Sequence, residues 1–256
     1  MKRLLYIALI AMAVVTGCSK TEQLLYSDVS RVQVSDTTTI NSTFFYEAAT
    51  KIRDTVYIQV NTIGKTENYD REVKLVQVTE MNVQNPAVPG VHYVAMDDPS
   101  IKSLMVVKAN AVNAMIPVIL LRDPSLKNNS YRLRLELTAN QQFGLGELQS
   151  RGRAIRFSDR LERFYSWRLD ALPAPASNTF GKYSTRKHQF MIDVLHQQID
   201  EAWYQAASSI GALSHYKNLL GEALAAYNTD PANIASGKAP MRETDAVGSP
   251  LVTFPL

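Results

Sequence analysis

The sequence is poor in the residue types that most often carry chemistry. Cys18 is its only cysteine, and there are four histidines in 256 residues. A chain with one cysteine forms no intramolecular disulfide, so its fold must depend on the hydrophobic core. The sequence also lacks the His-Glu-x-x-His, phosphate-loop and Gly-x-Ser-x-Gly patterns of metalloproteases, nucleotide-binding proteins and serine hydrolases. We therefore expect no catalytic residues, no metal site and no cofactor.

An excess of charge of one sign is also missing. If residues 1–17 are removed, Lys2 and Arg3 leave with them, and 25 basic side chains oppose 24 acidic ones. This balance gives no electrostatic footprint for nucleic acid, so we expect no nucleic-acid partner. We expect the basic groups at 151–153 and 160–163 to be solvated surface rather than phosphate or lipid-headgroup contacts.

The N-terminal apolar run is too short to span a membrane. It covers the 12 residues 4–15, whereas a transmembrane helix needs about 20. Lys2 and Arg3 precede it and small residues follow it, which is the anatomy of a secretory signal peptide. The segment Val15-Thr16-Gly17-Cys18 resembles the lipobox of bacterial lipoproteins. This resemblance implies that residues 1–17 are cleaved and that Cys18 is lipidated.

A diacylated Cys18 would hold even a soluble domain on a bilayer, because two acyl chains anchor firmly where one holds marginally. The polar segment 18–28 is then a tether between the lipid and the fold. Ser19 is not the aspartate that resembles an inner-membrane retention signal, so we expect an outer-membrane location. Only Glu22 is acidic among the residues just after Cys18, and the choice between cell surface and periplasmic face stays open.

Short strands with frequent turn signals are typical of residues 29–158. Leu133, Leu135 and Leu137 alternate with charged residues, the period-two pattern of a half-buried strand. Further strands are expected at 30–34, 43–47, 54–60, 73–79, 104–107, 115–121 and 154–157. This pattern predicts an antiparallel, immunoglobulin-like β-sandwich.

Two irregularities are expected within these strands, and two dipeptides mark turns between them. Pro117 cannot donate to a ladder and predicts an edge or bulged position. The segment 73–78 changes its apolar face partway and predicts a β-bulge. Asp98-Pro99 and Asp123-Pro124 are typical turn signals.

Helical periodicity begins after a Pro/Ala loop at 173–176. Ser184 is suited to cap a helix over 185–195, and 202–207 is a further short helix. One apolar stripe places Leu213, Tyr216, Leu220, Leu224 and Tyr227 at three- and four-residue intervals, and Asp230-Pro231 ends it. The fold class is thus mainly β with a smaller helix-containing C-terminal domain at 159–256, an α+β arrangement.

Several segments resemble known families. In the strand-rich part, PGVHY at 89–93, IPV at 116–118 and LRLEL at 133–137 resemble a degenerate Calx-β or immunoglobulin-like module. In the C-terminal part, SW at 166–167, FGKYSTRKHQFM at 180–191 and VTFP at 252–255 resemble an uncharacterised Bacteroidetes lipoprotein family. That family belongs to the domain-of-unknown-function class. The resemblance implies an accessory role beside Sus-like outer-membrane transporters in glycan or nutrient capture.

Aromatic residues are the one enrichment with chemical interest. Phe164, Tyr165 and Trp167 precede the Pro/Ala loop, and Trp203-Tyr204 lies between helical segments. Exposed aromatic rings can stack on sugars, which makes Trp167, Trp203 and Tyr204 candidate glycan contacts. Packing is the competing interpretation, because aromatic side chains bury large areas at domain junctions. We favour packing for all three, with Trp167 at the junction of the two domains.

Other polar groups offer weaker signals. His188, His196 and Asp200 are spaced for one helical face, but we expect polar surface histidines rather than a metal site. Asp97 and Asp98 precede a proline and indicate a turn rather than a calcium site.

Two classes of function follow. The first is a non-catalytic, membrane-anchored lipoprotein that binds glycan or docks on a transporter complex. The second is an envelope hydrolase whose paired carboxylates the sequence does not identify. A purely structural envelope protein is a third alternative.

Overall fold

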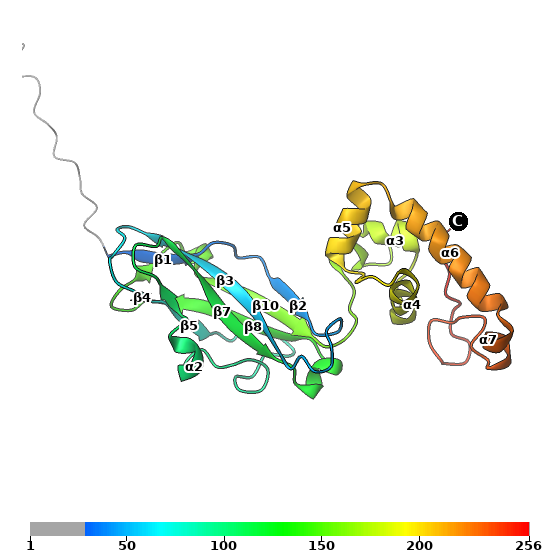
Figure 1. Cartoon of the computed structure of the whole chain (residues 1–256), viewed down its shortest axis with the longest axis horizontal. Helices are drawn as coiled ribbons and strands as arrows, with labels where there is room; N and C mark the ends of the chain where they lie inside the picture. Colours follow the sequence, from blue (N-terminus) through cyan, green and yellow to red (C-terminus); the bar gives the residue numbers. More distant parts are fainter. Residues whose placement is uncertain (1–28, 256) are drawn as a thin grey trace, which may run out of the picture.

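The computed structural model describes residues 29–255. The predicted signal segment, Cys18 and the tether 18–28 lie outside these residues. The described chain has two parts that follow each other along its long axis, a β-sandwich and a helical part (Figure 1). We name residues 159–168, which connect them, the linker segment.

The first sheet of the sandwich has four strands in the order β7-β3-β1-β9. The long strand β3 pairs antiparallel with both β1 and β7, whereas β1 and β9 run parallel. Pro117 lies in β7, the edge strand of this sheet, so the edge position predicted for it is confirmed. The strands are β1 (Arg31–Val34), β3 (Arg53–Ile63), β7 (Asn113–Leu121) and β9 (Gly144–Leu145).

The second sheet has the order β2-β10-β8-β5. Its strands β10 and β8 pair antiparallel, but β2 lies parallel to β10, so both sheets are mixed rather than antiparallel. The chain supplies both sheets with its first two strands. β1 joins the first sheet, and the chain then crosses to the second sheet as β2, where it runs parallel to β10. The strands are β2 (Ile40–Thr43), β5 (Lys74–Gln77), β8 (Tyr131–Thr138) and β10 (Gly152–Ser158).

The two sheets enclose one hydrophobic core. Leu133, Leu135 and Leu137 point into it from β8, as their alternation predicted, and Ile58 and Val60 meet them from β3. Burying such a side chain contributes about 1.5–3 kcal/mol. Short helical turns lie at the ends of strands: α2 (Pro99–Lys102), η1 (Pro124–Lys127) and η2 (Leu148–Ser150).

The segment 73–78 contains a change of partner where a bulge was expected. β4 (Arg71–Glu72) pairs with β6 (Val106–Val107), and β5 pairs with β8. Between them, the Val73 backbone N–H donates to the Met105 carbonyl at 2.8 Å. The segment thus leaves a two-stranded ribbon to join the second sheet.

The helical part begins with η3 (Tyr165–Trp167), within the linker segment. Ser184 caps α4 as predicted, its hydroxyl accepting from the Lys187 backbone N–H at 3.1 Å. The expected loop at 173–176 is half wrong, because Pro175 begins a helix and occupies the first-turn position where proline is tolerated. The elements are η3 (Tyr165–Trp167), α3 (Pro175–Phe180), α4 (Thr185–Leu195), α5 (Glu201–Ser209), α6 (Leu213–Thr229) and α7 (Pro231–Ala235).

A second hydrophobic cluster lies within the helical part. Leu220 and Leu224 of α6 belong to this cluster, and Leu213 and Tyr227 of the predicted stripe are partly buried against it. The first cluster ends at Phe157, and this one begins at Phe164. Strand takes 26% and helix 27% of the chain, which makes it a mixed α+β protein rather than a mainly β one.

Candidate binding groove between the two parts

A groove of about 710 Å³ lies where the sandwich meets the helical part. Its walls come from the end of β2, the loop after β2, the end of β10, the linker segment and the residues leading into α5. This volume is within the range of sites that bind small molecules, roughly 300–1,000 Å³. What distinguishes the groove is its lining, which comes from both parts of the chain and includes the exposed Tyr165.

Arg122 fixes the loop that forms one wall. Its guanidinium forms a two-pronged ion pair with Asp159 at 2.7 and 2.8 Å, and both side chains are largely buried. Nη1 donates to the Ala48 carbonyl at 2.7 Å, and Nη2, which also pairs with Asp159, donates to the Phe44 carbonyl at 3.1 Å. One side chain thus ties the loop after β2 to the first residue of the linker segment. Hydrogen bonds to a charged group of this kind stabilise by about 1.5–3 kcal/mol each.

The carbonyl of Ile199 joins the two parts directly. It accepts hydrogen bonds from the Tyr46 hydroxyl at 3.0 Å and from His188 Nε2 at 2.7 Å. A carbonyl only accepts, so His188 carries its proton on Nε2, and Nδ1 faces the Tyr183 hydroxyl at 3.3 Å. Burial lowers the pKa of His188 to about 4, and burial raises the pKa of Tyr46 above its ordinary value. Both side chains are therefore neutral at pH 7.

His188 is consequently not the surface histidine that the sequence suggested. Its side chain is buried between Phe164, Trp167 and Tyr183. The helical spacing correctly placed His188 in α4, but the sequence did not show that His188 lies on the buried face of this helix. Among residues 29–255, no group of three or more His, Cys, Asp or Glu side chains is placed to hold a metal ion.

Tyr165 is the exposed aromatic residue of the groove. It retains 66% of its surface, and the Arg168 guanidinium carbon lies 3.9 Å from its ring centroid. Arg168 also donates to the carbonyls of Tyr165 and Pro173, at 2.9 and 3.1 Å, which holds the guanidinium in place. The guanidinium therefore covers one side of the ring and leaves the remainder available to a ligand.

Acidic side chains in the groove are engaged by their neighbours. Glu201, for example, accepts from the Ser166 backbone N–H at 2.7 Å and from the Ser166 hydroxyl at 2.8 Å. Similar contacts hold the others: Glu47 accepts from Lys51, Glu162 from Arg156 and Arg160, and Asp200 from the Trp203 backbone N–H. These carboxylates position the linker segment and α5.

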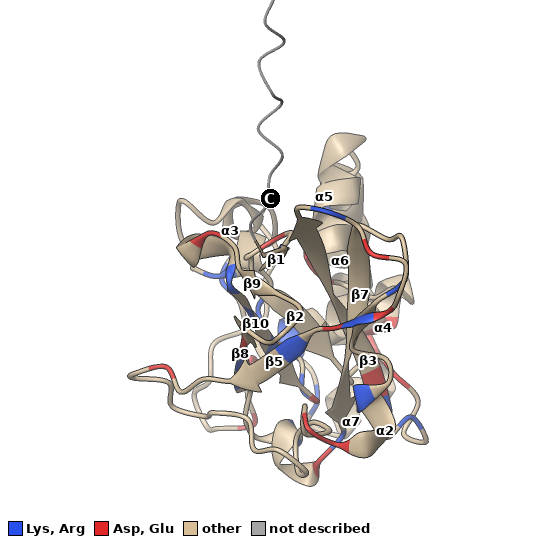
Figure 2. Cartoon of the chain, turned by 90° about the vertical axis from the view of Figure 1, so that its left-hand side faces the viewer, with Lys and Arg blue, Asp and Glu red and all other residues tan. Residues whose placement is uncertain are grey.

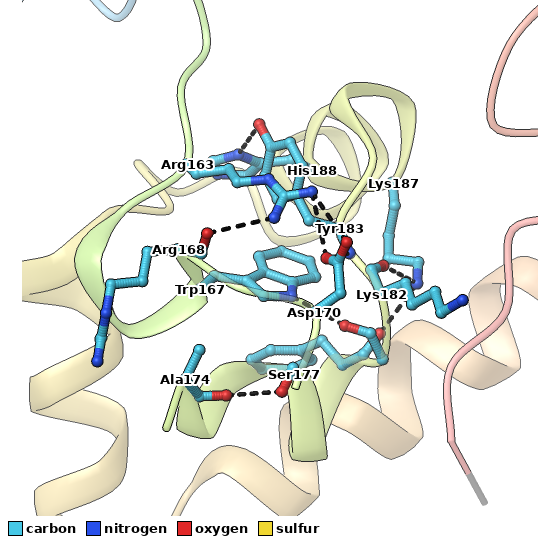
Figure 3. Close-up of polar contacts among 12 residues, drawn as sticks. Arg163, Trp167, Arg168, Asp170, Ala174, Ser177, Lys182, Tyr183, Lys187 and His188 are labelled. Carbon is cyan, nitrogen blue, oxygen red and sulfur yellow. Dashed lines mark hydrogen bonds and ion pairs between the residues drawn. The ribbon is translucent and has the colours of Figure 1, made fainter. Parts of the chain in front are cut away.

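The three aromatic candidates from the sequence lie mostly inside the helical part. Trp167 is fully buried and donates from Nε1 to the Gly181 carbonyl at 2.9 Å (Figure 3). It lies in the helical cluster, next to Phe180 and Tyr183, and not between the two cores. Tyr204 is 4% exposed. Neither Trp167 nor Tyr204 presents a ring to a ligand, because packing in the second cluster covers both.

Trp203 is only partly buried but lies outside the groove. Its ring packs against Phe180 and Tyr216, and its Nε1 donates to the Gln197 side chain at 2.7 Å. Sequence reasoning noticed Tyr165 among neighbouring aromatics and selected Trp167 instead. Residues one and two positions apart in a short 3₁₀ turn face different directions, and the pattern did not show which one faces solvent.

The fold and the groove define a two-part α+β protein with a groove at the junction of its parts. The chain belongs to a family of proteins that share a domain of unknown function, DUF4843, whose model matches residues 21–197. No curated protein matches the chain. Among residues 29–255, no helix combines the length and the apolar character needed to cross a bilayer. Cys18 and the lipobox lie outside the described residues.

Solved structures from Bacteroides are similar to part of the chain. A "putative carbohydrate binding protein" from Bacteroides ovatus is 15% identical, with a TM-score of 0.35, over 52% of this chain and 38% of that one. A protein of unknown function from the same organism is 14% identical, with a TM-score of 0.35, over 49% and 43%. A two-domain protein of unknown function from Bacteroides fragilis is 12% identical, with a TM-score of 0.32, over 51% and 45%. The chain spans less than half the length of each.

Proposed function

We propose that this protein is a lipid-anchored envelope protein that binds carbohydrate in the groove without transforming it. The observation that carries the proposal is the exposed Tyr165 ring among polar side chains. A ring of this kind can stack on the C–H face of a sugar. Neighbouring polar groups can hydrogen-bond the hydroxyls, which is the combination of apolar surface and placed polar groups that small-ligand sites use.

The groove carboxylates support a non-catalytic role. Glycoside hydrolysis needs two carboxyl groups that act on the scissile bond from opposite sides. Glu47, Glu162, Asp200 and Glu201 instead accept hydrogen bonds that hold loops and helix ends in place. These contacts support binding rather than hydrolysis. The exposed ring of Tyr165 supports binding rather than a purely structural role.

We also propose an outer-membrane location through lipid at Cys18, and a role as accessory to a Sus-like transporter. The lipobox pattern and the family resemblance of the sequence support both. The sandwich is proposed to be of the immunoglobulin-like or Calx-β type, which its two four-stranded sheets around one core support. Genes for a transporter pair next to the gene for this protein would support the accessory role, and co-purification with that pair would test it.

Replacing Tyr165 tests carbohydrate binding. A glycan array first identifies a ligand, and calorimetry then compares the wild type with Tyr165→Ala. We expect the variant to lose about tenfold in affinity, equivalent to about 1.4 kcal/mol, because the stacking surface is removed. Tyr57→Ala is the matched control, since Tyr57 is 51% exposed on β3 away from the groove.

Three results would oppose the proposal. They are an array without any binder, equal losses in the two tyrosine variants, and release of shortened sugars on prolonged incubation. The first would leave the purely structural interpretation, and the last would favour the hydrolase.

A further inference from the structure

The linker side of the groove concentrates positive charge. Arg156 of β10 and Arg160 of the linker segment both contact Glu162, at 3.1 and 2.9 Å. One carboxylate thus serves two guanidinium groups, whose side chains are 53% and 43% exposed. One positive charge in this trio is left without a counter-charge.

A second hollow of about 800 Å³ adjoins the groove and shares these residues. Five cationic side chains line it, against the two carboxylates of Asp159 and Glu162. The Asp159 carboxylate is already paired with Arg122, which lies outside the hollow. Arg163 is held by Asp170, whose pKa is lowered first by the Tyr183 backbone N–H and further by Arg163 (Figure 3).

The guanidinium groups retain free donors. Arg156 donates to Ser130 and Glu162, and Arg160 donates to Glu162 and the Asn128 carbonyl. Within residues 29–255, these hydrogen bonds leave Arg156 Nη1 and Arg160 Nη2 without an acceptor. Guanidinium nitrogens match the planar geometry of a carboxylate and also bind sulfate oxygens.

The concentration of charge is local. The whole chain carries a formal net charge of only +3. At the end of the sandwich remote from the helical part, basic and acidic positions are interspersed over strands and loops (Figure 2). In the groove itself four arginines are balanced by four carboxylates, so the excess of positive charge lies in the adjoining hollow, which shares Arg156 and Arg160 with the groove.

We infer that the groove and the adjoining hollow together take an acidic glycan, a sugar chain that carries uronate carboxylates or sulfate esters, with its acidic groups in the hollow. This inference rests on the proposed carbohydrate binding. Tyr165 stacks on one sugar ring, and Arg156 and Arg160 bind the acidic groups of the chain. Both arginines line the groove and the adjoining hollow, so a short oligosaccharide that crosses the linker segment reaches all three side chains.

A pair of ligands tests the inference on the unaltered protein. Calorimetry compares oligogalacturonate with its methyl ester, which keeps the sugar chain and removes its charge. A sulfated heparin oligosaccharide and neutral maltohexaose extend the comparison to sulfate and to an uncharged chain. We expect at least one acidic oligosaccharide to bind about tenfold more tightly than its neutral counterpart. This advantage should shrink as salt rises from about 0.05 to about 0.5 M, because salt screens exposed charges.

Variants connect the preference to the arginines. The double substitution Arg156→Gln and Arg160→Gln should remove the advantage of the acidic ligand, so that the acidic chain and its neutral counterpart bind with equal affinity. Arg151→Gln is the matched control, because Arg151 precedes β10 at its opposite end. Circular dichroism and the melting temperature show whether the double variant is folded. The comparison of acidic and neutral ligands uses the wild-type protein, so it stands even if the variant does not fold.

The outcomes separate the two proposals. Binding of neutral and acidic chains with equal affinity would overturn the acidic preference and leave carbohydrate binding intact. An absence of binding to every sugar would overturn both. Arginine-dependent binding to vesicles of phosphatidylcholine with phosphatidylglycerol, without sugar binding, would also overturn both and assign the cluster to lipid headgroups.

Discussion

Ile199 offers only an apolar side chain, yet its carbonyl oxygen is the atom at which the two parts of the chain meet. Tyr46 reaches it from the sandwich, and His188 reaches it from α4. Tyr46 is half-buried and His188 is buried, and the two hydrogen bonds satisfy both lone pairs of the carbonyl. Protonation of His188 would place a positive charge beside this carbonyl in a site where burial disfavours charge.

Lower pH should destabilise the protein through His188. Burial lowers its folded-state pKa to about 4, whereas the unfolded value is about 6.5. The unfolded chain binds the proton more tightly, so the contribution to stability is complete above about pH 6.5 and is lost as pH falls through 4. We expect a loss of up to about 3 kcal/mol in the free energy of unfolding. Urea titrations at a series of pH values between 7 and 4 measure it.

The control for this prediction uses a second histidine. His188→Gln keeps a donor toward Ile199 but does not titrate, so the decline with pH should become shallower. His215→Gln, on the exposed face of α6, should leave the slope as in the wild type. Equal slopes for all three proteins would show that His188 does not govern the acid sensitivity.

At the scale of elements, three Asp-Pro pairs show how one local signal has two outcomes. Asp98-Pro99, Asp123-Pro124 and Asp230-Pro231 were interpreted as turns or breaks, but they begin α2, η1 and α7. The fixed φ of proline suits both the second position of a turn and the first position of a helix. Ile101 and Leu126, which follow two of these pairs, are buried, and this packing favours the helical outcome.

Removing one of these caps should cost stability. The Asp123 carboxylate accepts from the Ser125 backbone N–H at 2.9 Å, and the hydrogen bonds of Ser125 lower the pKa of Asp123. We expect Asp123→Ala to lose about 1 kcal/mol, the usual cost of losing a helix cap. Asp123→Asn keeps an acceptor and should lose less than half as much. Thermal melting compares them, and a larger loss for asparagine than for alanine would rule out capping as the cause.

The elements that the sequence predicted well share a strong period. Leu133, Leu135 and Leu137 alternate cleanly, and Ser184 stands before a helical repeat. The strand expected at 43–47 failed for a different reason. Its aromatic residues have high strand propensity, but β2 ends at Thr43. Phe44 instead lies in a loop whose shape depends on Arg122, 78 residues further along the chain, and local periodicity cannot reveal so distant a contact.

The groove could not be predicted from the sequence for the same physical reason. It is assembled from β2, β10, the linker segment and the start of α5, which are distant in the sequence. The arginines at 160–163 were correctly expected at the surface. Their shared carboxylate, and the approach of Arg156 from β10, appear only once the chain is folded.

At the scale of the whole molecule, we propose that a lipid anchor at Cys18 decides where the groove operates. We expect Cys18→Ala to move the protein from the membrane fraction to the soluble fraction, because the acyl chains that supply the anchoring free energy are not attached. Incorporation of radiolabelled palmitate should disappear in the same variant. Ser19→Ala serves as the control and should keep both properties. Unchanged fractionation of the cysteine variant would count against lipid anchoring.

The position of the groove between two separately packed cores has one further consequence. Its walls belong to both parts, so any rotation of the helical part about the linker segment changes the shape that a ligand encounters. Occupancy and interdomain angle are then thermodynamically linked, and each biases the other by the same free energy. A sugar bound there would restrict rotation about the linker segment and so stiffen the molecule along its long axis.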